Sequence, residues 1–501
     1  MTDKYSPSLL HRKQYFYGPQ KFAAEDWIFT TLPDGKILST HPELELTRAE
    51  GNGFQVVMLG YILDPERVED SNQQILNRLC ASASNISAFI ELTDPLSGRW
   101  LFFVYHNGEA IVFNDPAGLR TAFYYLDDAG EPWLASHVGL IAPQFGLQVS
   151  AAAAEYMASE RYLARKERWF TGDSTPYAKI RHLLPNHLFD LKSKTVRRYW
   201  PLRPRQKFTL EEGVELVAGI LKKSIQAARR RAPLAMSMSS GVDSRMIFSA
   251  CKDITPEVYF FSMMYRHHTP ESDDIRVPRE IAQKLHLDHH VLDSRGEMDP
   301  ELKPIFQEHV KGIDYDWGKI VEVRRATLPQ DGLVLKGSIS EIVRCRYFAA
   351  GAYPYRVTLP RMVNLMNVGY TPLVFDTLQE WMKEAVDCEK LDYRLLDLLS
   401  WECEVGNYIS MGQLLYDLAQ EDFCPLNNRR LLTIMLGVDE KYRVYPDHIM
   451  ERKVTEALWP ELVTFPYTPS RKLPTRGIRD IQLLQWLKYL LFEEKKSRLE
   501  K

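Results

Sequence analysis

The stretch from residue 234 to residue 293 constrains the fold of this chain more than any other. It alternates three apolar runs, at 234–238, 258–265 and 289–293, with segments of helical periodicity. Strands that alternate with helices typically build a parallel sheet, because a crossover helix returns the chain to the same edge before the next strand begins. We therefore predict an α/β unit around a parallel sheet in the second part of the chain.

The first part of the chain has the texture of an antiparallel β structure. Residues 53–63 and 99–115 are runs of β-branched and aromatic side chains. The pair Asn107-Gly108 interrupts the second run, and this dipeptide is typical of a two-residue hairpin turn. We predict an α+β N-terminal domain, built as an antiparallel β sandwich with helices.

A composition change separates the two parts. Residues 197–207 are rich in proline and arginine, which suits a linker, and residues 208–231 then show helical periodicity. We predict two domains, 1–205 and 206–501. From about residue 350 the second domain reads as mostly helical, up to an amphipathic segment at its end.

Composition excludes several classes of protein. The 501 residues carry a net charge of −3, so no basic excess points to nucleic acid as a partner. No apolar run approaches the ~18 residues of a membrane span, and the start has no apolar core of a signal peptide. The 6 cysteines are scattered without a CxxC pair. We expect a cytoplasmic protein with no membrane contact and no disulfide framework.

One short motif carries most of the chemistry. Six residues lie between the 234–238 run and a helical segment: Ser239, Ser240, Gly241, Val242, Asp243 and Ser244. A small-residue turn that opens a helix aims backbone N–H groups and the helix dipole at one point, which binds phosphate. Asp243 would hold Mg²⁺ bridging to the phosphates. The alternative is an ordinary helix cap with Ser240 or Asp243 at the N-cap.

The loop resembles the SGGxDS pyrophosphate loop of the ATP-pyrophosphatase superfamily, with Ser240 in place of the first glycine. Three other segments are similar to the asparagine synthetase family: 98–125, which corresponds to the segment where the family carries DPxGxRxxYY, 133–141, and 180–201, with its Leu-Pro-Asn and Arg-Tyr-Trp. The resemblance implies a class II glutamine amidotransferase-like N-terminal domain followed by an ATP-pyrophosphatase domain. It also implies that ATP and Mg²⁺ are the cofactors.

The N-terminus departs from this family. Members that hydrolyse glutamine use a cysteine exposed after Met1 is removed, and here Thr2 stands at that position. An N-terminal threonine nucleophile is one alternative. We expect instead a degenerate glutaminase-like domain, as in the lactam synthetases and lasso-peptide cyclases that the chain also resembles, so that glutamine is not the nitrogen donor.

The synthetase half departs as well. The family's GxGxDE segment corresponds to residues 332–348, where Gly337 and the later Tyr347 fit and Glu341 is the only carboxylate left. By the resemblance, Glu341 is a catalytic residue that takes a proton from the attacking amine, or a second metal ligand. The alternative is a surface acid on a helix.

The family also uses a C-terminal lysine against the phosphates. Simple alignment places Tyr467 at that position, with Arg471 and Lys472 further on. We predict Lys472 as the catalytic cation, because a positive charge there would stabilise the leaving pyrophosphate. A solvated loop charge is the alternative, and Lys336 and Arg344 are weaker candidates for the same role.

Further contacts follow from the resemblance alone. Backbone beside Met238, Met263 and Gly337 would contact adenine and ribose. Asp273 and Asp274 resemble the acidic start of the helix after the second parallel strand, and N-capping is their alternative role.

We therefore expect an ATP-dependent, AMP-forming amide ligase without a functional glutaminase. Its partners would be a small-molecule or peptide carboxylate and an amine, and a homodimer is allowed by the sequence. Two alternatives stay open: an ammonia-dependent asparagine synthetase, and a non-catalytic nucleotide-binding homologue.

Overall fold

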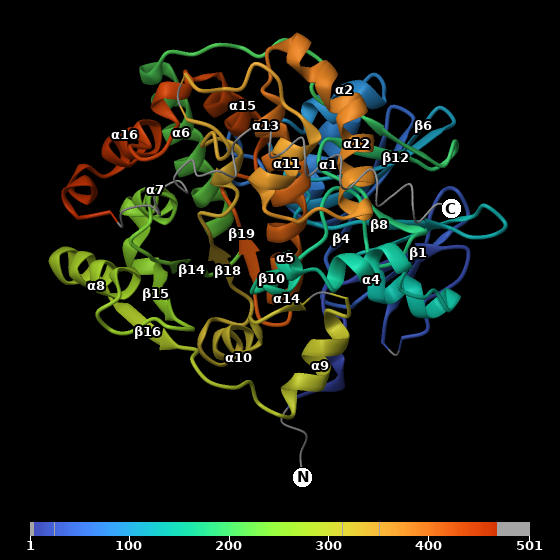
Figure 1. The fold of residues 1–501 in the computed structure, drawn as a ribbon, viewed down its shortest axis with the longest axis horizontal. Coiled ribbons are helices and arrows are strands. Elements are labelled where there is room, and N and C mark those ends of the chain that lie inside the picture. Colours follow the sequence, from blue (N-terminus) through green and yellow to red (C-terminus); the bar gives the residue numbers. More distant parts are fainter. Residues whose placement is uncertain (1–4, 25, 313, 350, 468–501) are drawn as a thin grey trace.

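Two antiparallel sheets followed by one parallel sheet organise the chain. The computed structural model describes residues 5–24, 26–312, 314–349 and 351–467. In this part of the chain the antiparallel sheets come from the N-terminal residues and the parallel sheet from the later ones (Figure 1). The predicted fold class, an α+β part followed by an α/β part, is confirmed.

Each antiparallel sheet brings together strands that are distant in sequence. In order across the first sheet, the strands are β11 (Ile180–His182), β8 (Phe123–Leu126), β9 (Pro132–Ala135), β1 (Tyr15–Gly18), β3 (Ile37–Thr40) and β2 (Ile28–Thr31). Across the second, they are β13 (Thr195–Arg198), β12 (His187–Asp190), β7 (Glu109–Asn114), β6 (Ser97–His106), β5 (Phe54–Leu63) and β4 (Leu46–Gly51).

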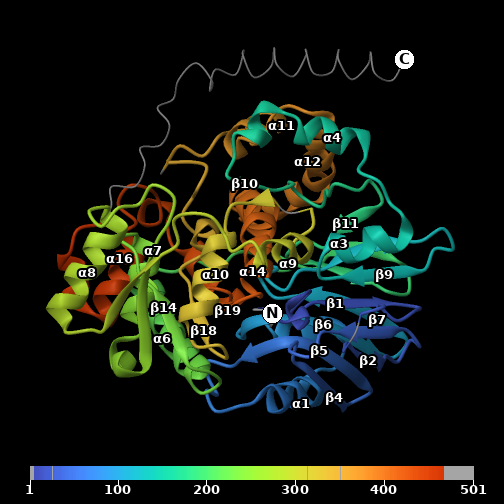
Figure 2. The ribbon, with the colours of Figure 1, turned by 90° about the horizontal axis from the view of Figure 1, so that it is seen from below.

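These two sheets face each other across an apolar core, as the sandwich prediction requires. Tyr17 of β1 and Phe103 of β6 pack with ring centroids 5.2 Å apart, and Leu59 and Leu134 lie in the same buried cluster. Figure 2 shows β1 and β9 stacked over β5, β6 and β7. Side chains on alternate positions of each strand point into this layer.

The predicted hairpin is confirmed. Strands β6 and β7 pair up to His106 and Glu109, and Asn107 and Gly108 form the turn with φ angles of 48° and 80°. Both angles are positive, as a turn of this kind requires, and asparagine and glycine adopt them at low cost.

The parallel sheet begins after residue 230. Its strands, in order, are β16 (His289–Asp293), β15 (Val258–Met264), β14 (Leu234–Ser237), β18 (Leu333–Leu335) and β19 (Glu421–Phe423). The three predicted strands form one half of this sheet, and β14 lies at its centre. Because all strands run the same way, their carboxyl ends meet at one edge.

Helices surround the sheets. In the first part they are α1 (Asn72–Ser82), α2 (Ile86–Leu92), α3 (Val138–Ile141), α4 (Ala151–Met157) and α5 (Glu160–Leu163). In the second part they are α6 (Leu210–Arg229), α7 (Val242–Ser249), α8 (Asp273–Leu285), α9 (Leu302–His309), α10 (Gly318–Thr327), α11 (Leu359–Met366), α12 (Pro372–Ala385), α13 (Leu395–Leu398), α14 (Ser410–Tyr416), α15 (Arg429–Gly437) and α16 (Ile449–Leu458).

Shorter helical turns connect them. The 3₁₀ segments are η1 (Pro7–Leu9), η2 (Ala142–Phe145), η3 (Lys252–Glu257), η4 (Ser340–Ile342), η5 (Val386–Leu391), η7 (Glu440–Tyr442) and η8 (Pro460–Thr464), and η6 (Leu399–Ile409) is π-helical. A short two-stranded ribbon pairs β10 (Glu167–Arg168) with β17 (Asp314–Tyr315).

Helix α6 shows why the predicted elements form where they do. Thr209 accepts a hydrogen bond from the backbone of Glu212, and the Glu212 carboxylate accepts one from the backbone of Thr209. This reciprocal cap satisfies N–H groups that the first helical turn leaves open. The apolar face of the helix is buried and contacts α15 and α16.

The proline- and arginine-rich stretch only partly fits a linker. Residues 197 and 198 still belong to strand β13, and the chain has no regular structure from there to residue 207. The amphipathic segment predicted at the end of the chain lies outside the described residues. Within the described residues, no helix has the length and apolarity needed to cross a bilayer. All cysteines are buried and unpaired by disulfides.

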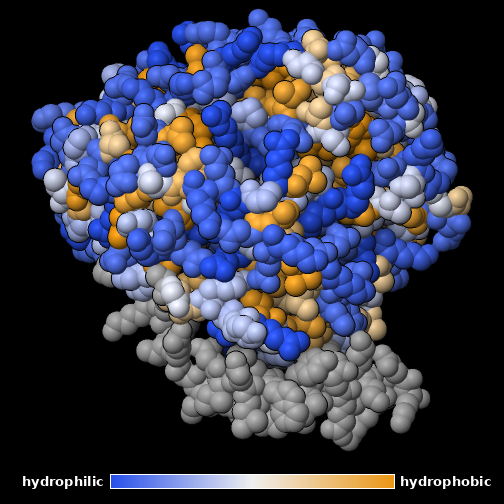
Figure 3. All heavy atoms as spheres, turned by 90° about the horizontal axis from the view of Figure 1, so that it is seen from above, coloured by the Kyte–Doolittle hydropathy of each residue, from blue (hydrophilic) through white to orange (hydrophobic). Residues whose placement is uncertain are grey.

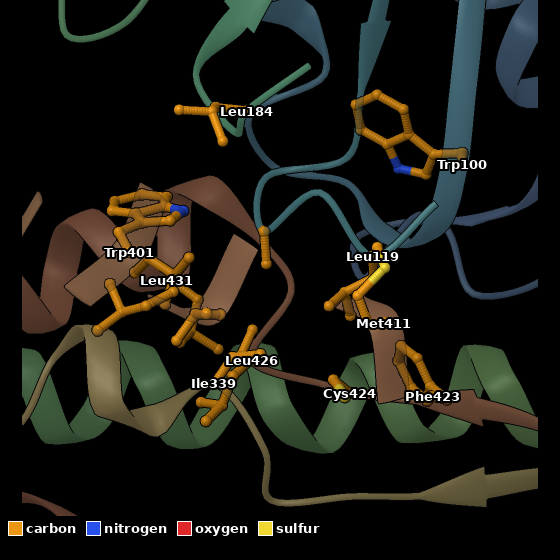
Figure 4. Close-up of a cluster of buried hydrophobic side chains, with 14 of the residues drawn as sticks. Trp100, Leu119, Leu184, Ile339, Trp401, Met411, Phe423, Cys424, Leu426 and Leu431 are labelled. Atoms are coloured by element: carbon orange, nitrogen blue, oxygen red, sulfur yellow. The ribbon is translucent and has the colours of Figure 1, made fainter. Parts of the chain in front are cut away.

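An apolar interface joins the two parts of the molecule. Figure 4 shows Trp100 and Leu119 of the N-terminal part near Met411 and Phe423 of the C-terminal part. The Trp401 indole N–H donates to the backbone oxygen of Pro116 at 2.7 Å. Buried ion pairs cross the same interface, among them Arg99 with Asp417 and Arg120 with Glu421.

One face of the molecule is mainly hydrophilic (Figure 3). On the face shown in Figure 3, hydrophobic residues lie in separate patches among hydrophilic ones. The largest exposed apolar side chains come from distant elements, for example Phe29 of β2, Leu163 of α5 and Val386 of η5. Scattered exposure of this kind is ordinary for globular proteins and carries no argument for a partner.

Candidate functional site

The predicted phosphate loop lies at the carboxyl edge of the parallel sheet. Strand β14 ends at Ser237, the chain turns, and α7 begins at Val242 with Gly241 as its N-cap. The predicted order of strand, small-residue turn and helix is confirmed. The N-cap alternative is wrong, since Gly241 occupies that position and no side chain caps the helix.

Hydrogen bonds inside the loop hold its shape. The hydroxyls of Ser239 and Ser244 lie 2.6 Å apart, and Ser239 Oγ accepts the N–H of Gly241 at 3.2 Å. The backbone N–H of Met238 donates to Phe261 of β15 at 2.7 Å, which ties the loop to the neighbouring strand. Both predicted serines therefore contact the loop backbone itself.

A carboxylate occupies part of the loop's donor set. Asp274 Oδ1 accepts the backbone N–H of Ser240 at 3.0 Å and the Ser240 hydroxyl at 2.6 Å. Ser240 thus donates two hydrogen bonds to an anionic acceptor within the chain. The N-cap of α8 is Ser272, so Asp273 and Asp274 are first-turn residues and their N-cap alternative is wrong.

A pocket of about 350 Å³ opens beside the loop. Predicted residues Met238, Ser239 and Met263 line it, together with Asp274 and Lys336. Further lining residues share an aromatic side chain: Phe261, Tyr265, Trp317, Tyr408 and Tyr416. The lining also carries charged side chains, among them Glu167, Arg266 and Arg324, so polar surface exceeds apolar surface in this pocket. A concave shape and convergent polar groups are two features of small-molecule sites.

Gly337 packs directly against the start of α7. A Cβ atom on Gly337 would lie 2.7 Å from the carbonyl carbon of Asp243 and 2.8 Å from the nitrogen of Ser244. Two residues later, Ile339 takes a positive φ of 73° and is fully buried. A β-branched residue there is strained by about 1–3 kcal/mol, so surrounding packing must hold this turn against the loop.

The predicted metal ligands meet at an arginine. Arg344 Nη1 donates to Asp243 Oδ2 at 2.8 Å, and Arg344 Nη2 lies 3.3 Å from Glu341 Oε1. The side chains of both acids are 24% exposed. The other oxygen of each, Asp243 Oδ1 and Glu341 Oε2, is buried and has no hydrogen-bond partner among the described residues.

Charge and burial act on these groups in opposite directions. Burial raises the pKa of Asp243, although Arg344 opposes the shift. Burial would also raise the pKa of Glu341, but Arg344 and then Arg346 outweigh it and the net shift is downward. Burial raises the pKa of nearby Glu451 to about 7. The Asp243 and Glu341 carboxylates therefore already have a cationic partner.

The residues around Asp243 do not fit a magnesium ion in this arrangement. The guanidinium of Arg344 engages one oxygen of each carboxylate, and its positive charge opposes a divalent cation at the same place. Among the described residues, no group of three or more His, Cys, Asp or Glu is arranged to hold a metal. Magnesium binding at Asp243 and at Glu341 stays a prediction.

The C-terminal predictions divide between described and undescribed residues. Lys472 and Arg471 lie outside the described residues, as does Thr2 at the other end. Tyr467 is described, and its ring lies 3.9 Å from the guanidinium carbon of Arg245 and 4.3 Å from that of Arg452. Arginine therefore supplies the positive charge at Tyr467.

Sequence reasoning missed two contacts of this site. The contact between Asp274 and Ser240 and the role of Arg344 as a carboxylate partner had no local pattern to reveal them. Lys336 lines the pocket, and burial lowers its pKa. The sequence predicts Lys336, directly before Gly337, as a weaker candidate for the cation.

Comparisons with known proteins give one family match and two structural similarities. Glutamine phosphoribosylpyrophosphate amidotransferase from B. subtilis, solved with ADP and GMP, is 10% identical, with 68% of this chain and 72% of that chain covered and a TM-score of 0.22. A structure described as the allosteric regulatory enzyme of purine biosynthesis is also 10% identical. The match covers 72% of this chain and 74% of that chain, with a TM-score of 0.23. Scores this low support no inference. No curated protein matches the sequence. The family evidence is the match of residues 216–309, which contain the whole loop and α7, to the model described as asparagine synthase.

Proposed function

We propose that this protein is an ATP-dependent, AMP-forming amide ligase without a functional glutaminase. The observation that carries the proposal is the Ser239–Ser244 loop, which opens α7 at the carboxyl edge of the parallel sheet beside a pocket of about 350 Å³. The asparagine synthase match over residues 216–309 supports an enzyme of the ligase or amidotransferase type.

The donors of the loop support an anionic ligand. Ser240 already gives its N–H and hydroxyl to a carboxylate oxygen of Asp274, so both groups are oriented toward an anion. Gly241 adds no side chain at the helix start, and the α7 dipole favours negative charge there. A pyrophosphate group would take these donors in exchange for Asp274.

The pocket walls support the remaining part of a nucleotide. Met238 and Met263 line the pocket, and backbone beside them would contact adenine and ribose. Ser262 donates to the backbone oxygen of Met238 at 2.9 Å and fixes the strand ends that form this wall. Lys336, which lines the pocket, would supply a positive charge for the phosphate or carboxylate.

The proposed reaction has two steps. A carboxylate oxygen of the substrate bonds to the α-phosphorus of ATP, and the bond from that phosphorus to the bridging oxygen of pyrophosphate breaks. An amine nitrogen then bonds to the acyl carbon, AMP leaves and the amine loses a proton. Position and electrostatics supply most of the acceleration, since the acyl-adenylate is itself reactive. The lowered pKa of Glu341 makes it a weak acceptor for that proton.

A second candidate is a non-catalytic homologue that binds nucleotide. The pairing of Arg344 with both Asp243 and Glu341 favours it, because the two predicted metal ligands, one of them the predicted catalytic residue, are held in ion pairs. An ammonia-dependent asparagine synthetase stays an alternative prediction, and no described contact selects aspartate as the substrate.

The test uses the purified full chain with Mg²⁺-ATP, a pool of amino acids and small carboxylates, and ammonia or amines. Nucleotide products are identified by mass spectrometry. AMP with pyrophosphate, formed without glutamine, supports the ligase, whereas ADP contradicts the loop assignment. ATP binding without any product supports the non-catalytic homologue. S240A should weaken nucleotide binding, and S193A, at an exposed serine in a turn of the N-terminal part, is the matched control.

A further inference from the structure

The acids of the proposed site are already neutralised from within the chain. Arg344 contacts Asp243 of α7 at 2.8 Å and lies 3.3 Å from Glu341 of η4. Its own side chain is 18% exposed. One guanidinium thus bridges two separate elements, with one oxygen of each carboxylate on its two terminal nitrogens.

The arginines that flank this contact are engaged elsewhere. Arg346 makes two bonds to Glu404, at 2.6 and 2.7 Å. Arg443 donates to the backbone oxygen of Val343 at 2.7 Å. Arg344 is therefore the cation assigned to these two acids within the described part of the chain.

We propose that Arg344 is a built-in counter-cation that takes the place of a divalent metal at Asp243 and Glu341. A planar guanidinium satisfies two carboxylates with fixed geometry, and its charge is permanent. A divalent ion placed beside it would meet like charge in a mostly buried setting. The two unpartnered oxygens, Asp243 Oδ1 and Glu341 Oε2, are the ligands a metal would gain once the guanidinium is removed.

This inference goes beyond the proposed function and rests on it only in its nucleotide arm. The primary test measures Mn²⁺ binding to the full chain without nucleotide. Binding is monitored through the decrease of the EPR signal of the free ion. The wild type should show no Mn²⁺ site that depends on Asp243. R344M should gain one such site, about tenfold or more tighter than any in the wild type, and D243N added to R344M should abolish it.

Thermal unfolding gives a second readout that needs no activity. Mn²⁺ should raise the melting temperature of R344M, because a ligand that binds only the folded state stabilises it, and should leave the wild type unchanged. R344K keeps a cation and should behave like the wild type. R276M is the matched control, since Arg276 also contacts two acids, Asp273 and Glu280, on the surface of α8.

Two results would overturn the inference: a wild-type Mn²⁺ site that D243N removes, or wild-type ATP affinity that falls more than about tenfold when Mg²⁺ is replaced by a chelator. Failure of R344M to fold leaves the wild-type, D243N and R344K titrations to decide. Absence of nucleotide binding with and without Mg²⁺ refutes the proposed function instead, and the Mn²⁺ result still stands.

Discussion

Replacing Gly337 by alanine should destabilise this protein although the change adds only one methyl group. The new Cβ would lie 2.7 Å from the carbonyl carbon of Asp243, 2.8 Å from the nitrogen of Ser244 and 2.9 Å from the oxygen of Asp243. All three atoms are backbone, so no side chain can rotate away. Either α7 or the segment after β18 must shift, and overpacking of this kind costs about 1–3 kcal/mol.

The chain supplies a control of the same chemistry and the opposite sign. Gly219 is exposed in the middle of α6, and a Cβ there meets nothing within 4 Å. Alanine at this position should stabilise the helix by about 0.5–1 kcal/mol, because glycine loses more backbone freedom on folding.

Urea unfolding of the two variants and the wild type measures both effects from the shift of the transition midpoint at a common slope. A second measurement, ATP binding, should weaken for G337A and not for G219A, since only Gly337 touches the loop helix. Equal stability of G337A and the wild type, within about 0.5 kcal/mol, would refute the argument that backbone contact excludes a side chain here.

Three further predictions concern buried charge. D417A should destabilise the chain by about 3–5 kcal/mol in urea unfolding, because it removes the bidentate partner of Arg99, which is 1% exposed, donates to Asp417 at 2.8 Å across the interface and keeps Glu421 at 3.6 Å as its one carboxylate partner among the described residues; a cost below 1 kcal/mol would contradict it. Burial lowers the pKa of His182 to about 4 and of His309 to about 3. Below about pH 6.5 these histidines therefore bind protons in the unfolded chain but stay neutral in the folded chain. Their stabilisation is full above pH 6.5 and declines as pH falls toward 4, with about 2 kcal/mol lost per histidine at pH 5, and unfolding curves that stay level from pH 7 to 5 would exclude this. D274N should bind inorganic pyrophosphate about fivefold tighter in calorimetry, because it removes an anion from the loop at a gain of about 1 kcal/mol; unchanged or weaker binding would contradict the competition.

The sequence predicted what depends on local pattern. The run at 234–238, the small residues after it and the helical segment that follows have their own periodicities, so strand, turn and helix could be placed before the structure was known. Asn107 and Gly108 are a comparable case, because their preference for positive φ is a property of the residues themselves.

The contacts that decide how the site works could not be predicted in this way. Asp243 and Arg344 are 101 residues apart, Ser240 and Asp274 are 34 apart, and no spacing rule joins them. Strand β19 was missed for a related reason, since three residues carry no readable alternation and only pairing with β18 defines them. Whether Asp243 faces a metal or an arginine is a property of the fold.

Two polar groups of the proposed site are already paired within the chain, and this pairing affects how tightly a ligand can bind. The N–H of Ser240 donates to Asp274, and Asp243 Oδ2 accepts from Arg344, so these two groups of the proposed site have partners before any ligand arrives. An incoming pyrophosphate therefore exchanges one anion for another on the loop. The binding free energy from the loop is then only the difference between the hydrogen bonds of pyrophosphate and those of Asp274 to the same donors. Contacts with the pocket and with Lys336 add to it. Affinity should then depend more on the walls of the pocket than on the loop, which distinguishes this chain from phosphate loops whose N–H groups wait unpaired.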